Sequence, residues 1–157
     1  MAIDPRANSP EKLVPPPPLP LISRRALQRV RNLLPPPETC PYCNGQVRLV
    51  SNDAIYGKLY GDWPYAYLCA PCDAMVGLHP GTDIPLGTLA NRVLRRARSI
   101  SKQLFHHTKE RYGFTRSQAY EWLALQMQIP LGECHFGWFD LAQCDQAAEI
   151  CKGVLRG

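Results

Sequence analysis

The chain has 157 residues, a formal net charge of +5, 45% hydrophobic residues and seven cysteines. This length fits one domain with a tail. The composition excludes a membrane-spanning protein, because no apolar run approaches the about 20 residues that a membrane helix needs. We expect no secretory leader, because the first residues lack the basic and apolar regions of one. We therefore expect a soluble cytoplasmic protein in a reducing compartment, where spare thiols stay free.

The first 37 residues form a basic arm that contains ten of the sixteen prolines and carries a net charge of +4. Proline fixes φ and lacks a backbone donor, so the proline runs at 15–18 and 35–37 should be extended and solvated. Between them, Ser23 can cap a short amphipathic helix that continues to Leu34. The sequence predicts a largely disordered arm over 1–37 and a single zinc-binding domain over 38–157.

Two Cys-x-x-Cys pairs follow the arm, separated by 25 residues, which is room for a strand, a turn and a returning strand. Both sulfurs of each pair can reach one ion, and four thiolates in a tetrahedron are a ligand set of structural zinc. Two disulfides or a redox pair explain the pattern less simply. The sequence predicts one structural Zn²⁺ with no open coordination position, bound by Cys40, Cys43, Cys69 and Cys72.

The residues around these pairs have the pattern of a zinc ribbon, a small β module over 38–80. Strands are expected at 46–50, 54–60, 65–68 and 74–78, where β-branched and aromatic residues are bounded by glycine and proline. The tyrosines of this module have two interpretations. They either stack on nucleic-acid bases or, more simply, cover a thin core.

The first helix predicted after the zinc ribbon carries most of the positive charge. It begins at the cap Thr88 and runs to about 105, with a stripe of apolar residues that includes Val93 and Ile100. Residues 88–116 carry a net charge of +7, whereas the segments before and after, 38–87 and 117–157, each carry −3. Such a concentration is typical of a polyanion-binding surface. We expect contacts to DNA or RNA from Arg92, Arg95, Arg96, Arg98 and Lys102.

Two further helices complete the prediction, which is an α+β fold with its helical part over 88–155. Thr115 and Gln118 form a capping box for one helix, which stops before Pro130. Asp140 caps the other helix, and Gly153 is expected to end it.

The order of motifs along the chain resembles a known family. Cys-Pro-Tyr-Cys is followed by Tyr-Gly, by Cys-x-x-Cys-Asp-Ala-x-Val-Gly-x-His, by Pro-Leu-Gly-Thr-Leu-Ala-Asn and by the Arg-rich helix. Near the end come Arg-Ser-Gln-Ala-Tyr-Glu-Trp-Leu-Ala and Cys-His-Phe-Gly-Trp-Phe-Asp-x-x-x-Cys. Over residues 38–150, the chain resembles the zinc-finger-containing domain of unknown function found in bacteriophage and prophage proteins.

The resemblance implies a phage-encoded zinc protein of the host cytoplasm, with the four cysteines as metal ligands and no activity that can be carried over. It also implies a histidine after the Arg-rich segment. This chain has Ser101 near that place, and His106 and His107 follow a turn or more later.

The sequence favours nucleic-acid binding and leaves alternatives. The first is a protein-interaction factor that binds a host protein through the exposed arm, which would fold on its partner. A nuclease is less favoured, because the candidate bases and acids show no recognisable metal-nuclease spacing. These candidates are His79, His106, His107, His135, Asp53, Asp73, Glu121 and Asp140. A second metal site at Cys134, His135 and Cys144 is also disfavoured, because adjacent side chains diverge.

Overall fold

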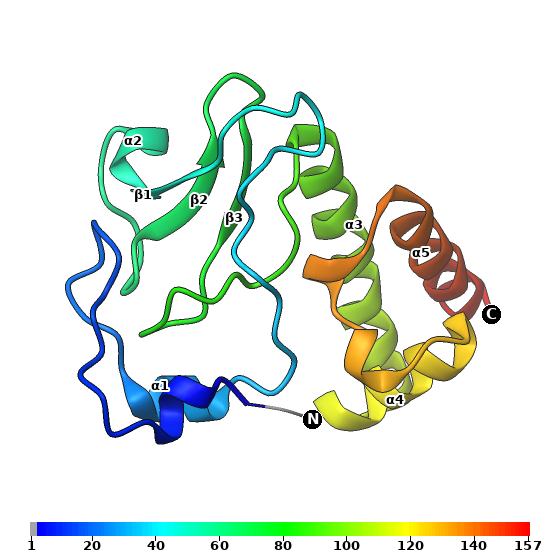
Figure 1. The fold of residues 1–157 in the computed structure, drawn as a ribbon. Coiled ribbons are helices and arrows are strands. Elements are labelled where there is room, and N and C mark those ends of the chain that lie inside the picture. The colour runs from blue at the N-terminus through cyan, green and yellow to red at the C-terminus, as the bar shows by residue number, and fades with distance from the viewer. Residues whose placement is uncertain (1–2) are drawn as a thin grey trace. The chain divides into compact units, whose positions relative to one another are not determined.

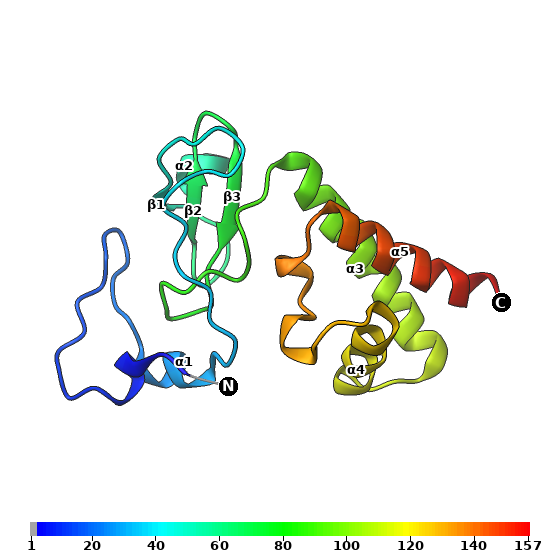
Figure 2. The ribbon, with the colours of Figure 1, turned by 45° about the vertical axis from the view of Figure 1, so that its right-hand side comes forward.

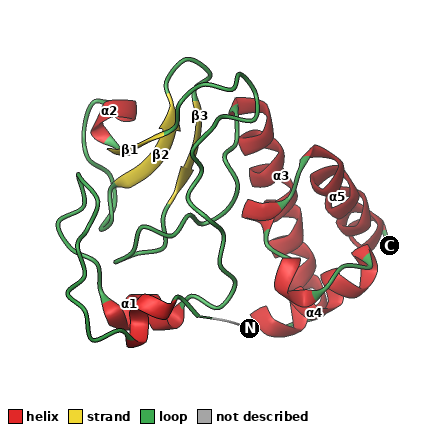
Figure 3. Cartoon of the chain, viewed as in Figure 1, coloured by secondary structure: helices red, strands yellow, loops and turns green. Residues whose placement is uncertain are grey.

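The structure is a computed structural model that describes residues 3–157 (Figure 1). The first two residues of the predicted arm lie outside the described residues. The chain forms two compact units, one up to Asn91 and one from Arg92 to Gly157. Among the described residues, every strand belongs to the first unit and the second is helical (Figures 2 and 3). The secondary structure is thus α+β, as predicted.

The first unit is built on a three-stranded antiparallel sheet in the order β1-β2-β3. Its strands are β1 (Arg48–Ser51), β2 (Tyr65–Cys69) and β3 (Ala74–Gly77). Three of the four predicted strands are confirmed, with boundaries shifted by one or two residues. The core of the unit consists of Cys40, Val47, Tyr67, Cys69, Ala74, Val76, Leu78 and Leu89. Two of the predicted zinc ligands are therefore core residues.

The strand predicted at 54–60 is wrong. Instead α2 (Asp53–Tyr56), a single helical turn, follows β1 and ends at Gly57, whose φ is 79°. The Asn52 side chain closes the loop that follows, because its amide donates to the Tyr60 carbonyl at 2.8 Å and its oxygen accepts from the Tyr60 N–H at 3.0 Å. Local hydrogen bonds thus satisfy backbone groups that a strand would have paired.

The N-terminal arm packs on the rest of the first unit, which differs from the disorder expected for 1–37. It contains a 3₁₀ helix at Pro5–Asn8 and α1 (Arg24–Arg29), which Ser23 caps as predicted but which ends before Leu34. Its buried side chains form a cluster with one residue of the loop at 79–84. The cluster consists of Ala7, Leu27, Val30 and Ile84. Few apolar residues suffice here, because a second segment of the chain covers them.

The loop at 79–84 joins the arm to the sheet. The Arg6 guanidinium forms a two-pronged ion pair with the Asp83 carboxylate, with N–O distances of 2.7 and 3.1 Å. The Ser23 N–H donates to the Gly81 carbonyl at 2.8 Å. On the other side of the loop, the Tyr67 hydroxyl of β2 donates to the Asp83 carbonyl. The short loop at 79–84 therefore holds both the N-terminal arm and the sheet.

Substitutions in the arm test this packing. Leu27 is fully buried, so Leu27→Ala should lower the free energy of unfolding by about 2–5 kcal/mol. Leu21 is 50% exposed in the same arm, and Leu21→Ala should change that free energy by less than about 0.5 kcal/mol. Denaturant unfolding of the two variants measures both effects. Near-zero changes in both would mean that the arm is free in solution.

The second unit consists of α3 (Arg92–Tyr112), α4 (Arg116–Met127) and α5 (Leu141–Arg156), with two 3₁₀ turns between α4 and α5. The predicted capping box at Thr115 and the predicted cap at Asp140 are confirmed, and the latter is also a capping box. The Thr115 and Asp140 side chains each accept a hydrogen bond from the backbone N–H of the glutamine three residues on. The side-chain oxygen of that glutamine in turn accepts a hydrogen bond from the backbone N–H of the cap residue. Of the helices in residues 3–157, none is long and apolar enough to cross a membrane.

The predicted start of the basic helix at Thr88 is wrong. Ala90 pairs instead with Met75 of β3 through two backbone hydrogen bonds of 2.9 and 3.1 Å. This extended pairing ties up the residues before Arg92, so α3 begins there. The helix then continues past the predicted end near 105 to Tyr112.

The buried face of α3 also differs from the predicted stripe. Val93 is 62% exposed and Ile100 is 46% exposed. Leu94, a residue of the predicted stripe, is buried as expected, and the other buried residues of α3 are Ser101, Phe105 and Thr108. The Ser101 hydroxyl donates to the Ala97 carbonyl at 2.8 Å, and the Thr108 hydroxyl bonds its own helix in the same way, so neither is buried without a partner. Small residues on this face let α5 pack closely, an arrangement that hydropathy alone does not reveal.

Candidate metal centre

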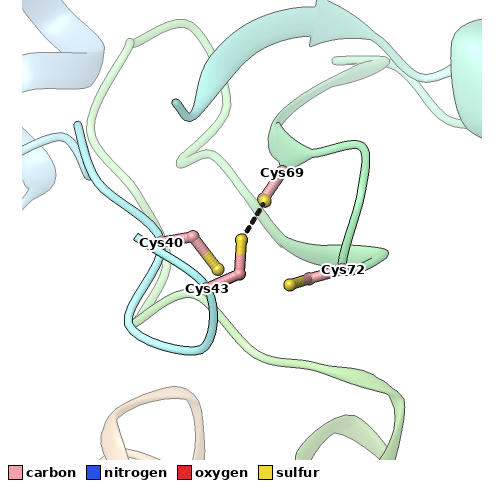
Figure 4. A group of neighbouring side chains, drawn as sticks. All are labelled: Cys40, Cys43, Cys69 and Cys72. Atoms are coloured by element: carbon pink, nitrogen blue, oxygen red, sulfur yellow. Dashed lines mark hydrogen bonds between the residues drawn. The ribbon is translucent and has the colours of Figure 1, made fainter. Parts of the chain in front are cut away.

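The four predicted zinc ligands converge in the first unit (Figure 4). Cys40 and Cys43 lie in the turn before β1, Cys69 ends β2, and Cys72 lies in the turn before β3. Their sulfur atoms all lie within 4.8 Å of one another, and those of Cys43 and Cys69 are 3.5 Å apart. A zinc–thiolate tetrahedron with Zn–S bonds of about 2.3 Å has S–S edges of about 3.8 Å. The spacing therefore fits a single zinc ion.

Both cysteine pairs end in the same kind of turn. The residue after the second cysteine has a left-handed backbone in each, with φ of 59° at Asn44 and 55° at Asp73. Asn and Asp adopt this conformation more readily than other non-glycine residues. In the first pair, the Tyr42 N–H donates to the Cys40 sulfur at 3.4 Å, and the Gly45 N–H donates to the other sulfur at 3.3 Å. Such donors stabilise thiolates and orient them.

The electrostatics of the cysteine cluster favours a bound cation. Burial raises the pKa of Cys40, but hydrogen bonds, chiefly from the backbone N–H groups of Tyr42 and Cys43, outweigh this and lower it to about 7. A hydrogen bond with Cys43, followed by burial, raises the pKa of Cys72 to about 12. The first thiolate to form thus opposes ionisation of its neighbours. A divalent ion removes this repulsion, and tetrahedral thiolate ligation selects zinc.

The burial of the site indicates a structural role. Cys40 and Cys69 are fully buried in the core of the first unit, whereas Cys43 is exposed and Cys72 is half-buried. One ion would cross-link the turn before β1 to the β2–β3 turn. Four protein ligands fill the tetrahedron, so no position is left for a reactive water. The metal would therefore stabilise the fold and bind no substrate.

These features define a four-cysteine zinc-finger protein. The family of zinc-finger-containing domains named DUF3268 matches residues 36–154, and the chain belongs to this family. No curated protein and no solved structure matches the chain. The matched segment includes residues of both units, and the single domain predicted over 38–157 stays a prediction.

The five predicted cations of α3 fall into two groups. Those that are exposed are Arg92, Arg96 and Lys102. At 3.6 residues per turn they lie within about 120° of arc, roughly opposite the buried face. Arg95 and Arg98 are half-buried, and Arg98 Nε donates to the Phe139 carbonyl at 3.0 Å. Arg98 therefore has a structural contact in the second unit as well as its charge.

The candidate catalytic side chains are not gathered into a site. Among residues 3–157, the four cysteines are the only group of three or more His, Cys, Asp or Glu side chains close enough to share an ion. Cys134 is buried, which raises its pKa to about 11, and it forms no such group with His135 and Cys144. Asp140 is a helix cap. Asp73, a candidate acid by sequence, instead has the left-handed backbone after the second pair that Asn44 has after the first.

Loss of one ligand tests the metal centre. Wild-type protein should carry one zinc per chain, and Cys72→Ser should lose both the zinc and the folded first unit. Structural zinc in small modules has an apparent binding free energy of about 10–16 kcal/mol, much of which is folding free energy. Metal analysis and circular dichroism measure the two losses. Cys134→Ala, outside the centre, should keep its zinc. A folded, metal-free Cys72→Ser variant would contradict the structural role.

A second test addresses the space beside the ligands. A Cβ on Gly45 would lie 3.0 Å from the Cys43 sulfur, so Gly45→Ala should displace that ligand. We expect zinc affinity to fall by about 10–100-fold in chelator competition, as it does when second-shell contacts are disturbed. Unchanged affinity would show that the turn relaxes freely around the methyl group.

Gly153 provides the matched control for the glycine substitution. It lies inside α5, which continues past the helix end predicted there, and a Cβ at this position meets nothing within 4 Å. Gly153→Ala should leave zinc affinity unchanged. It should raise the free energy of unfolding by about 0.5–1 kcal/mol, because alanine loses less backbone entropy than glycine in a helix.

Proposed function

We propose that this structural-zinc protein binds nucleic acid, DNA or RNA, through α3. The observation that supports the proposal is the exposed arc formed by Arg92, Arg96 and Lys102. It lies in a segment, 88–116, with a net charge of +7. Cations presented in this way neutralise phosphates and release their counterions. Arg95 and Arg98 would add to the local positive potential.

At neutral pH the arginines and lysines of α3 would make the phosphate contacts, and the neighbouring His106 would not. Partial burial, followed by the nearby charges of Lys102 and Lys109, lowers the pKa of His106. A group with a lowered pKa and an ordinary value of about 6.5 is neutral at pH 7. The strength of nucleic-acid binding should therefore not depend on this side chain above pH 7.

We further propose that the metal module is a zinc ribbon and that the protein is phage-encoded and acts in the host cytoplasm. The position of one cysteine pair at the β2–β3 turn and of the other just before β1 supports the ribbon. The order of motifs, from Cys-Pro-Tyr-Cys to Cys-His-Phe-Gly-Trp-Phe-Asp, supports the origin. In this proposal, zinc supplies the fold and α3 supplies the binding surface.

Binding measurements on a triple variant test the proposal. Labelled single-stranded DNA, duplex DNA and RNA of about 20 nucleotides would be titrated between about 50 and 200 mM salt. The variant carries Arg92→Gln, Arg96→Gln and Lys102→Gln. Each lost phosphate contact lowers the slope of log K against log salt by about 0.7–0.9, so the slope should fall by about 2–3. Zinc content should be unchanged.

A second triple variant separates specific contacts from total charge. It carries Arg25→Gln, Arg29→Gln and Arg31→Gln, three exposed positions of the arm, and so makes the same change in net charge. The α3 variant should lose far more affinity than this arm variant. Equal losses would contradict a binding surface on α3.

The alternative function is a protein-interaction factor that binds a host protein. Absence of nucleic-acid binding by the wild type at low salt would favour it. The observation on its side is that, within residues 3–157, no strand of the sheet pairs with the outer edge of β1.

A further inference from the structure

We propose that the outer edge of β1 binds an extended, basic peptide segment of a partner protein. This goes beyond nucleic-acid binding and does not rest on it. β1 is an edge strand, and within residues 3–157 no strand of the sheet lies on its outer side. Such an edge offers unpaired backbone donors and acceptors to another chain.

The sheet register identifies the outward groups. β1 pairs with β2 antiparallel, and just beyond the strand the Asn52 N–H donates to the Pro64 carbonyl at 2.7 Å. Hydrogen-bonded pairs alternate along an antiparallel ladder, so the even-numbered residues of β1 face β2. Leu49 and Ser51 therefore direct their N–H and C=O groups away from the sheet. These four groups are the ones that an added strand would pair.

The chain begins an outer strand here and does not continue it. Thr39 forms an isolated antiparallel bridge with Gln46. The same register, continued by three residues, would place Pro36 opposite Leu49. Proline has no N–H to donate, and no backbone hydrogen bond joins Pro36 to Leu49, so the ladder is not continued by the run at 35–37. The edge beyond the bridge is thus left for a strand whose residues carry donors.

Two pockets flank this edge and are lined by alternate residues of β1. One, of about 490 Å³, is lined in part by Glu38, Leu49 and Tyr67. The other, of about 350 Å³, is lined in part by Arg48 and Val50. Successive residues of a strand point to opposite faces of a sheet. Successive side chains of an added strand would therefore enter the two pockets in turn, as in known recognition by strand addition.

The charge of the larger pocket specifies a Lys or Arg side chain. The Glu38 carboxylate is exposed and forms no ion pair among the residues that the structure describes. Asp83, on the same wall, is already paired with Arg6. The proline and Tyr67 side chains that line the pocket suit the aliphatic stem of a long cation. The segment around it, 38–87, has a net charge of −3, which also attracts a basic partner.

The probe is the peptide acetyl-TKVKVT-amide, in which lysine and valine alternate. It should bind zinc-loaded protein in calorimetric titration, and acetyl-TEVEVT-amide should not. Bound peptide should also slow amide hydrogen exchange at Leu49 and Ser51, the residues with outward N–H groups.

Two N-methylated peptides provide the sharpest comparison. One carries methyl groups on the backbone amide nitrogens of its lysines, and the other on the backbone amide nitrogens of its valines. In an added strand only one of these two sets faces β1. Methylation of the set that faces β1 should weaken binding by about tenfold or more, because it removes the interstrand donors. Either set can be the one that faces β1, but not both. The other peptide should bind as the parent does. Equal affinities for both would overturn strand addition.

Protein variants locate the site. Ser51→Pro removes an outward donor that β2 does not use and should abolish peptide binding, while Ser51→Ala should not. Zinc content and circular dichroism show whether Ser51→Pro stays folded. If it does not, Glu38→Gln, compared with Glu133→Gln in the second unit, decides the matter. Only the former should weaken binding, by about two- to fivefold.

Three further results would overturn the proposal. The first is no binding of the lysine peptide at millimolar concentration. The second is equal loss in the two glutamate variants. The third is a chain that sediments as a dimer and that Glu38→Lys returns to monomer, since a second copy would then occupy this edge.

Discussion

The convergence of four cysteine sulfurs on one point is the constraint on which the first unit depends. The sulfurs come from two turns and meet within 4.8 Å. Cys40 and Cys69 are core residues in one cluster with Tyr67 and Val76. Without zinc, four ionisable groups would occupy the place where a sheet of three short strands most needs cohesion. The metal thus acts as the central part of a core that the apolar residues alone make thin.

The sheet and one loop connect the rest of the first unit to this metal centre. β1 starts soon after the first cysteine turn, and β3 starts directly after the second, so their positions follow from the metal site. The loop at 79–84 then accepts bonds from Tyr67 on one side and from the arm on the other. The arm is therefore held to this loop by the Arg6–Asp83 ion pair and by one small apolar cluster.

The two proposed binding surfaces have opposite charge and different backbone chemistry. The outer edge of β1 offers donors, acceptors and a carboxylate, which suit a basic extended chain. The exposed arc of α3 offers side-chain cations on a helix whose backbone bonds are all internal, which suits phosphates. The zinc site has no open coordination position, so it takes part in neither peptide binding nor phosphate binding. In this proposal its role would be to make the first surface rigid, because the edge that would bind a peptide begins beside the first cysteine pair.

The sequence by itself determined the zinc ligands, three strands and the helix caps at Ser23, Thr115 and Asp140. Each of these depends on residues close together in the chain, such as a Cys-x-x-Cys pair or the capping box at Thr115. Only the tertiary structure decided the state of the arm, the start of α3 and its buried face. The arm packs because the distant loop at 79–84 covers it, and α3 starts late because Ala90 pairs with Met75. Its buried face follows from Ser101 and Thr108, small residues whose hydroxyls bond within the helix and whose burial no hydropathy pattern shows.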